Sequence, residues 1–351
     1  MNNMKRPFFF TFLFVLTILI SNLFCQVAPF LQRIHTNTKI STTDMPYRLC
    51  VPVGYDTNQS YPLVLFLHGA GERGTNNTAQ LTANQGATLW AKEVNQNTYP
   101  CFVLAPQCAN GKLWVDTNWG LGSYNQDKIP ISEQLSMVLD ILNSLQNEFK
   151  INSLKIYVTG LSMGGYGTWD LITRFPTKFA AAIPICGAGD PSKASLLGAL
   201  PIRVFASSDD GTVPVSGSRD MVNAINALGP NNRSEFYTEY TDQGHGSWVN
   251  AYNTTNLVSW LFTSKPITYT LTNIQNQKNN AKIYIQNGKL VSDLSSMSGD
   301  IQISVFDSKG SKINSIQSKG LELLKFNVIN KGLYLVRVQN GDKEYVQKVV
   351  L

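Results

Sequence analysis

Between residues 46 and 262, short apolar runs alternate with amphipathic segments. The clearest run, 62–67, reads Pro-Leu-Val-Leu-Phe-Leu, which is typical of a parallel strand buried on both faces. Residues 131–149 carry apolar side chains at helical spacing, which predicts an amphipathic helix. Further strands are predicted at 46–53, 101–105, 154–158, 179–185, 201–206 and 234–240, and further helices at 166–175, 216–228 and 254–262. Strands that alternate with helices predict an α/β fold with a mostly parallel sheet covered on both faces.

The pattern changes beyond residue 265. Residues 267–280 are polar without a clear period, and they predict a linker that closes a first domain at 26–266. From residue 281 the helical period disappears, and short alternating segments are separated by turn pairs such as Asn287-Gly288. These segments, at 282–286, 301–306, 311–315, 323–328, 333–339 and 345–350, predict a small all-β, sandwich-like domain over 281–351.

The amino terminus carries a basic pair followed by an apolar run. Lys5 and Arg6 precede residues 7–24, which are predominantly apolar and contain no charged side chain. This order predicts a signal peptide over residues 1–25, with cleavage near Cys25. We therefore expect a secreted or cell-surface protein with no stable membrane span after signal removal; a retained membrane anchor is the alternative.

The composition of the chain limits the kinds of partner that we expect it to bind. Charged residues make up only 15% of the chain, which suits a secreted protein, and the net charge of +6 includes no basic run. We therefore expect no nucleic-acid partner. The cysteines beyond residue 25 lack the paired spacing of a zinc site, so no metal is expected. Cys50 and Cys186 are expected as buried thiols. A bridge between Cys101 and Cys108 stays open, since it needs the intervening chain to fold back.

The stretch Gly160-Leu161-Ser162-Met163-Gly164 joins a predicted strand to a predicted helix. Gly-x-Ser-x-Gly in that context is the nucleophile elbow, which holds a serine exposed on a sharp, strained turn. The two glycines remove side chains that would collide across the turn. The alternative is a glycine-rich turn with an incidental serine. We predict that Ser162 is a nucleophile.

A serine nucleophile needs a base and an acid behind it. Of the three histidines in the chain, His245 stands just after the last predicted sheet strand. The order serine, acid, histidine requires a carboxylate between Ser162 and His245 at a strand end. Asp209 and Asp210 both stand there, and the Val-Pro pair at 213–214 favours Asp210.

An oxyanion hole needs two backbone N–H donors, one after the nucleophile and one after an earlier strand. Met163 and Ala70 occupy those positions, and we predict that their amides bind the oxyanion. His68 is expected to tie the loop down by hydrogen bonds rather than to act in catalysis. Glu72 and Arg73 form an internal ion pair or touch substrate, and both readings stay open.

Residues 45–262 resemble a known group of proteins, the α/β-hydrolases of the secreted esterase type. This group includes polyhydroxybutyrate-depolymerase-like enzymes, feruloyl and acetylxylan esterases close to carbohydrate esterase family 1, and a "predicted peptidase" branch. The matching motifs are Pro-Tyr-Arg-Leu at 46–49, His-Gly-Ala-Gly-Glu-Arg-Gly at 68–74, Ala-Pro-Gln-Cys at 105–108, Gly-Leu-Ser-Met-Gly-Gly at 160–165, Val-Pro-Val at 213–215 and Gly-His-Gly-Ser-Trp at 244–248. One motif departs: such enzymes usually show His-Gly before the acid, and Ala206-Ser207 stand there instead.

The resemblance implies an α/β-hydrolase fold and a serine carboxylesterase without cofactor. Acetyl or feruloyl esters on plant polysaccharide are the implied substrates. Trp114, Trp119 and Trp248, with Tyr124, either stack on a sugar or phenolic ring or pack the loops. The alternatives are a peptidase of the prolyl-oligopeptidase type, a polyester depolymerase, and an inactive carbohydrate-binding homologue. The complete order of serine, acid and histidine argues against inactivity.

The tail, 279–351, resembles the C-terminal sorting domain of the type IX (Por) secretion pathway. The resembling motifs are Val-Phe-Asp at 305–307 with Lys-Gly at 309–310, Gly-Leu-Tyr-Leu-Val-Arg-Val at 332–338, and Lys-Val-Val-Leu at 348–351. The family implies passage through the periplasm, recognition by the secretion machinery, and removal or surface anchoring of the tail. The alternative is a carbohydrate-binding or spacer sandwich, because such a fold alone states no function.

Overall fold

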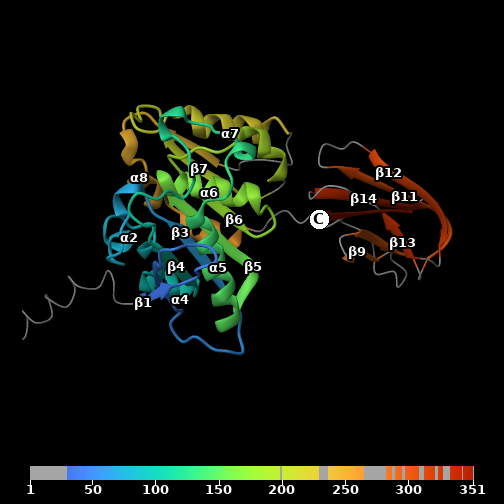
Figure 1. Ribbon diagram of the computed structural model, residues 1–351, viewed down its shortest axis with the longest axis horizontal. Coiled ribbons are helices and arrows are strands. Elements are labelled where there is room, and N and C mark those ends of the chain that lie inside the picture. Colours follow the sequence, from blue (N-terminus) through green and yellow to red (C-terminus); the bar gives the residue numbers. More distant parts are fainter. Residues whose placement is uncertain are drawn as a thin grey trace, which may run out of the picture. The chain divides into compact units, whose positions relative to one another are not determined.

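The computed structural model divides into two compact units, 1–267 and 268–351 (Figure 1). It describes residues 30–197, 200–228, 236–264, 282–286, 289–294, 297–307, 312–320, 323–326, 333–341 and 343–350. The predicted signal peptide, the predicted linker and the turn pairs at 287–288, 309–310 and 331–332 lie outside these residues.

Within the described residues, unit 1 contains one eight-stranded sheet in the order β1-β2-β4-β3-β5-β6-β7-β8. In this order the six strands from β4 to β8, which include β3, run parallel to one another. At the other edge β2 pairs antiparallel with β4, and β1 pairs antiparallel with β2. Their bounds are β1 Phe30–His35, β2 Met45–Cys50, β3 Tyr61–Leu67, β4 Phe102–Pro106, β5 Ile151–Leu161, β6 Ala181–Ile185, β7 Arg203–Ser207 and β8 Phe236–Tyr240. This confirms the predicted α/β fold with its mostly parallel sheet.

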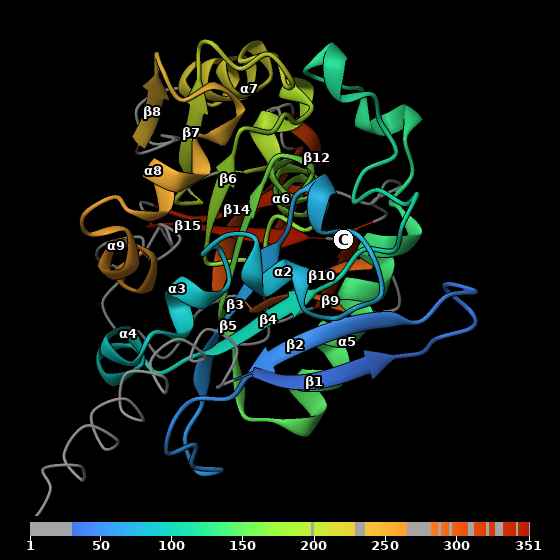
Figure 2. The same ribbon diagram turned by 90° about the vertical axis from the view of Figure 1, so that its left-hand side faces the viewer.

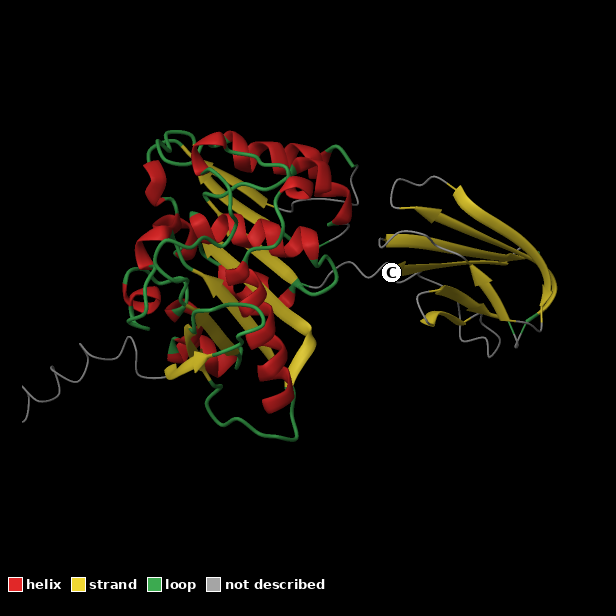
Figure 3. Cartoon of the chain, viewed as in Figure 1, coloured by secondary structure: helices red, strands yellow, loops and turns green. Residues whose placement is uncertain are grey.

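Helices cover both faces of this sheet (Figures 2 and 3). Successive residues of β3 alternate between two buried clusters: Leu65 packs with one, and Val64 with the other. One cluster includes side chains of α5 Glu133–Glu148, α6 Met163–Arg174 and α7 Ser216–Asn226; the other includes side chains of α3 Thr88–Ala91, α8 Trp248–Tyr252 and α9 Leu257–Thr263. The remaining short helices are α2 Ala79–Thr82 and α4 Glu93–Thr98. No helix among the described residues has the length and apolar character needed to cross a bilayer.

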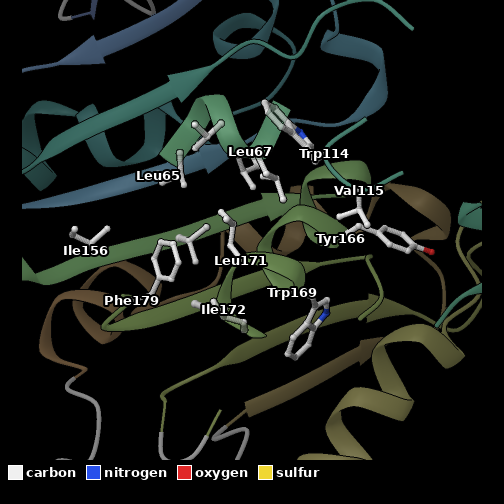
Figure 4. Close-up of a cluster of buried hydrophobic side chains, with 14 of the residues drawn as sticks. Leu65, Leu67, Trp114, Val115, Ile156, Tyr166, Trp169, Leu171, Ile172 and Phe179 are labelled. Carbon is white, nitrogen blue, oxygen red and sulfur yellow. The ribbon is translucent and has the colours of Figure 1, made fainter. Parts of the chain in front are cut away.

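Figure 4 shows part of the first cluster. Trp169 and Leu171 of α6 lie here with Leu65 and Leu67 of β3, and all four are wholly buried. Burying a large apolar side chain contributes roughly 1.5–3 kcal/mol. The helix that follows Ser162 is therefore held firmly against the strand that precedes the oxyanion loop.

In unit 1 the clearest differences from the sequence-based expectation concern β1 and β5. Strand β1 was not predicted; of its six residues only Phe30 is buried, so it lacks the alternation that marks a half-buried strand. His35 ends this edge strand, and its Nε2 lies 2.7 Å from Asp140 Oδ2. Strand β5 extends beyond the predicted 154–158 at both ends; none of its three extra residues at the start, 151–153, is buried, so they carry no strong apolar signal.

Within the described residues, unit 2 contains two antiparallel sheets, β13-β10-β9 and β12-β11-β14-β15. Side chains from both sheets, among them Ile283, Val305 and Phe326, share one buried cluster. The bounds are β9 Lys282–Gln286, β10 Lys289–Asp293, β11 Ser298–Asp307, β12 Lys312–Gly320, β13 Leu323–Phe326, β14 Leu333–Asn340 and β15 Lys343–Val350. Strand β10 was not predicted, and β12 extends beyond the predicted 311–315.

The four cysteines in the described part of unit 1 are all free and buried. Cys50 and Cys186 therefore match the expected thiols. The open bridge between Cys101 and Cys108 is absent, because β4 runs extended between them and carries the two residues apart. Burial raises the pKa of Cys108 to about 12, so this thiol stays protonated near neutral pH.

Candidate active site

The turn from β5 into α6 positions Ser162. This residue has φ 54° and ψ −120°, a left-handed conformation that is strained for a side chain other than glycine. Its amide donates to Ile185 O at the end of β6, at 3.0 Å. Helix α6 begins at the next residue, Met163. The backbone at Ser162 thus has the strained turn that the sequence predicts.

Gly160 and Gly164 allow this turn to close. A Cβ atom at Gly164 would lie 1.9 Å from the carbonyl oxygen of Leu67, and one at Gly160 would lie 2.3 Å from Gly164 O. Both neighbours are backbone atoms in a packed interior and cannot move aside cheaply. The predicted collision across the turn is confirmed at both positions.

The structure brings Ser162, His245 and Asp210 into one hydrogen-bonded line. Ser162 Oγ lies 2.8 Å from His245 Nε2, and His245 Nδ1 lies 2.8 Å from Asp210 Oδ2. A carboxylate can only accept, so Nδ1 carries the proton and donates it to Asp210. Nε2 is then free to accept the hydroxyl proton of Ser162, which is the arrangement a general base requires.

Asp210 and its neighbour Asp209 make different contacts. Asp210 Oδ1 accepts the amides of Thr212 at 2.8 Å and Val213 at 2.9 Å. Burial acts to raise the pKa of Asp210, but hydrogen bonds from His245 and these two amides outweigh it and lower the pKa below its usual value. Asp210 therefore stays ionised, as a partner of a histidine proton must.

Asp209 points to a different part of the loop. Its Oδ1 accepts the Gly244 amide at 2.9 Å and the hydroxyl of Ser207 at 2.5 Å. Ser207 is wholly buried and stands where the resembling enzymes usually carry glycine. Asp209 thus ties the exit of β7 to the loop that carries His245, and it does not touch the imidazole.

Met163 and Ala70 each begin a helical segment close to Ser162. Each is the first residue of a helix, α6 and the 3₁₀ turn η1 Ala70–Glu72, and amides in a first helical turn have no intrahelical acceptor. A Cβ atom at Gly69, next to Ala70, would lie 3.7 Å from Ser162 Cβ. The two predicted oxyanion donors therefore flank the nucleophile.

His68 holds the Ala70 loop, as expected. Its Nδ1 lies 2.6 Å from Gly69 O, to which it donates, and its Nε2 accepts the Cys108 amide at 2.9 Å. The ring is wholly buried, and burial lowers the pKa of His68 to about 4. The predicted structural role is confirmed by these bonds, which need the neutral ring.

This buried ring predicts acid sensitivity. An unfolded histidine takes up a proton near pH 6.5, whereas folded His68 resists protonation down to about pH 4. Folding is therefore destabilised by up to about 3 kcal/mol as pH falls across this window. We expect the difference in unfolding free energy between pH 7 and pH 4.5, measured by urea denaturation, to shrink in His68→Gln. Parallel pH profiles for the two proteins would contradict this assignment.

Arg73 also secures the oxyanion loop. Its Nε donates to Ala70 O at 2.9 Å, and its guanidinium carbon lies 5.9 Å from the centre of the Trp119 ring. Among the described residues no ion pair joins Glu72 and Arg73; Glu72 Oε2 lies 3.8 Å from His68 Nδ1 instead. This decides against the ion-pair alternative, and the bond to Ala70 O gives Arg73 a structural role in the loop.

The aromatic residues separate into two groups. Trp114 is wholly buried, and its Nε1 donates to His68 O at 2.9 Å, so the prediction that it binds substrate is wrong. Tyr124 is also buried and donates to Asp170 Oδ1 at 2.8 Å. Trp119 and Trp248 are partly exposed, and the rings of Trp248 and His245 form a T-shaped contact with centres 5.4 Å apart.

Cys186 lies beside the triad and was not anticipated as part of this site. One ligand atom each from Cys186, Asp210 and His245 fall within 4.8 Å of one another. A signal for this did exist: Cys186 directly follows β6, and the carboxyl ends of neighbouring parallel strands meet at one edge of a sheet. Sequence spacing alone does not give the order of the strands, so the neighbourhood could not be inferred.

The comparison with known proteins finds a matching family and a curated relative. The profile of an esterase family, described as "Putative esterase", matches residues 38–315. Poly(3-hydroxyalkanoate) depolymerase C from Paucimonas lemoignei is 28% identical over 138 residues, which is 39% of this chain and 30% of the depolymerase. The chain thus matches only about a third of the length of that relative.

Solved structures give the same picture. A crystal structure of a thermostable esterase is 40% identical, with a TM-score of 0.62 over 68% of this chain and 64% of the other. A ferulic acid esterase with 12% identity has a TM-score of 0.50 over 66% of this chain and 98% of its own, a likeness that concerns the fold alone.

Proposed function

Since the chain belongs to this esterase family, we propose that it is a serine carboxylesterase that works through an acyl-enzyme intermediate. The observation that carries the proposal is the hydrogen-bonded line from Ser162 through His245 to Asp210. Three groups of these types in this order form a nucleophile, a general base and the acid that orients the base. The strained elbow and the two flanking amides support the same reading.

The mechanism follows from these positions. Ser162 Oγ attacks the carbonyl carbon of the ester while His245 Nε2 takes its proton, and Asp210 stabilises the imidazolium that forms. The amides of Met163 and Ala70 donate to the oxyanion. His245 then returns the proton to the departing alcohol, which leaves an acyl group on Ser162. A water molecule, activated by the same histidine, releases the acid.

For the substrate, we propose acetyl or feruloyl esters on plant polysaccharide. The motif resemblance supports this class. The partly exposed rings of Trp119 and Trp248 are available for stacking on a sugar or phenolic ring. The depolymerase relative supports a second candidate, hydrolysis of a bacterial polyester, and the peptidase alternative remains the third.

A substrate panel tests these candidates. The purified protein is offered p-nitrophenyl acetate, methyl ferulate, acetylated xylan, poly(3-hydroxybutyrate) and a peptide anilide. We expect turnover of the simple esters and of acetylated xylan or methyl ferulate, and none of the anilide, because amide cleavage demands better protonation of the leaving group. Faster turnover of the anilide than of every ester would overturn the proposal.

For the tail, we propose a sorting domain that is recognised by the type IX secretion machinery. Unit 2 has its own buried cluster and carries none of the proposed catalytic residues. A hollow of about 570 Å³ lies on it, lined by residues including Asp300, Gln317 and Lys319. None of the described residues that line it is aromatic, whereas stacking rings are what a sugar-binding module would be expected to offer.

Removal of the tail distinguishes its two readings. A chain that ends near Lys265 keeps the whole of the described unit 1 core, so we expect full turnover of p-nitrophenyl acetate by the purified protein. In the producing cell we expect the truncated enzyme to accumulate in the periplasm. Cell fractionation measures this, and a pull-down of both purified forms on insoluble xylan is the control. Normal secretion of the truncated form would end the sorting-domain reading.

A further inference from the structure

Cys186 is a buried thiol for which the proposed mechanism has no use. It is 2% exposed, and its sulfur lies with an imidazole nitrogen of His245 and a carboxylate oxygen of Asp210, all within 4.8 Å of one another. Two of these three groups form the acid–base pair of the proposed mechanism. Any ligand that bridges all three must therefore interrupt the line between Asp210 and His245.

Ser247 supplies an independent observation at the same place. It is wholly buried, and its Oγ has no hydrogen-bond partner of acceptable geometry among the described residues. Ser247 stands two residues after His245 and is the N-cap residue of α8, so it belongs to the same turn as the imidazole. An unsatisfied buried hydroxyl calls for an explanation, and a ligand that it contacts is one.

From this geometry we propose that Cys186, Asp210 and His245, with the hydroxyl of Ser247 as a fourth oxygen, form an inhibitory site for a thiophilic divalent cation such as Zn²⁺. Sulfur, nitrogen and oxygen donors are the set that zinc accepts in four-coordinate sites. With bonds of about 2.0–2.3 Å, tetrahedral ligand atoms lie about 3–4 Å apart. The ligand atoms of Cys186, Asp210 and His245 lie within 4.8 Å of one another, so they would move closer together to reach that spacing.

The proposal rests on the proposed function only for its inhibitory effect. On binding, the S–H bond of Cys186 breaks and its proton passes to the solvent as the metal–sulfur bond forms. The nitrogen of His245 nearest to Asp210 is Nδ1. If that atom binds the cation, its proton moves to Nε2, and the ring stays neutral. Nε2 can then no longer accept the Ser162 proton, and turnover stops.

The donor set also predicts selectivity. Mg²⁺ and Ca²⁺ prefer oxygen ligands and larger coordination numbers, so neither should compete for a site that contains a thiolate. Zn²⁺ and Cd²⁺ should bind, and Cd²⁺ bound to a thiolate gives an ultraviolet charge-transfer band that reports binding without any need for activity.

The test combines this band with inhibition of p-nitrophenyl acetate hydrolysis by Zn²⁺. We expect both in the full chain, and neither with Mg²⁺ or Ca²⁺. In Cys186→Ala the band should vanish, and the Zn²⁺ concentration that halves each protein's own rate should rise more than about tenfold, since even outer-shell changes cost that much. Cys50→Ala is the matched control, because Cys50 is equally buried in the same apolar cluster and lies outside the site.

Two further variants keep the result decisive. Ser162→Ala should retain the band, because Ser162 is no ligand; this separates failure of the cation site from failure of the proposed function. Cys186→Ser keeps the side-chain volume and replaces the alanine variant if that one does not fold; it should lose the Cd²⁺ band. A band of full strength in either Cys186 variant, or no band in the unmodified protein, would overturn the proposal.

Discussion

Replacing Ser162 with alanine should abolish hydrolysis of p-nitrophenyl acetate while the protein remains folded. The variant removes the atom that attacks the carbonyl and leaves both flanking amides in place. Loss of a triad member typically costs about 10⁴-fold or more in kcat, with a residual rate that the oxyanion hole and substrate binding supply. No other described serine has its Oγ placed by the elbow and hydrogen-bonded to His245.

The measurement is the initial rate at saturating substrate, followed by release of p-nitrophenol. Circular dichroism and the urea midpoint serve as the control for folding. We expect the midpoint to stay the same or rise, because alanine tolerates the left-handed turn about as poorly as serine but no hydroxyl must be desolvated at this nearly buried position. Activity of the variant within tenfold of the unmodified enzyme would rule out Ser162 as the nucleophile.

The elbow could be read from the sequence because it is local. Its requirements all fall within a few residues: an apolar strand, two glycines that pack against backbone oxygens, and a helix start. The sheet was likewise predictable, since buried parallel strands are apolar on both faces, as β3 is. Edge strand β1 could not be predicted, because only one of its residues is buried and no hydrophobic period marks it.

The surroundings of the triad could not be read in the same way. Trp114 is an aromatic residue on a long loop, and the sequence does not say that this loop turns back so that the indole packs against His68. Cys186 follows β6 and Ser247 belongs to the segment after β8, and the strand order β6-β7-β8 brings the ends of these strands to one edge of the sheet. Contacts that depend on strand order carry no signature in residue spacing.

Asp210→Asn should reduce kcat far more than Asp209→Asn. Asp210 Oδ2 accepts the Nδ1 proton of His245 at 2.8 Å, whereas Asp209 accepts from Gly244 and Ser207 and does not contact the ring. An amide at position 210 can present its NH₂ group to Nδ1, which favours the tautomer with the proton on Nε2 and blocks acceptance of the Ser162 proton. In a serine protease the same exchange lowers kcat about 10⁴-fold.

The neighbouring carboxylate makes the comparison a sharp one. Asp209→Asn removes the same charge one residue away, so a general electrostatic effect would appear equally in both variants. The Asp209 variant weakens a tie between the exit of β7 and the histidine loop, and we expect a loss of no more than about tenfold, because one hydrogen bond contributes roughly 1 kcal/mol. Values of kcat and KM for p-nitrophenyl acetate over a range of pH decide the matter. If the Asp209 variant proves the more damaging, the acid of this site is one residue earlier in the chain than the structure places it.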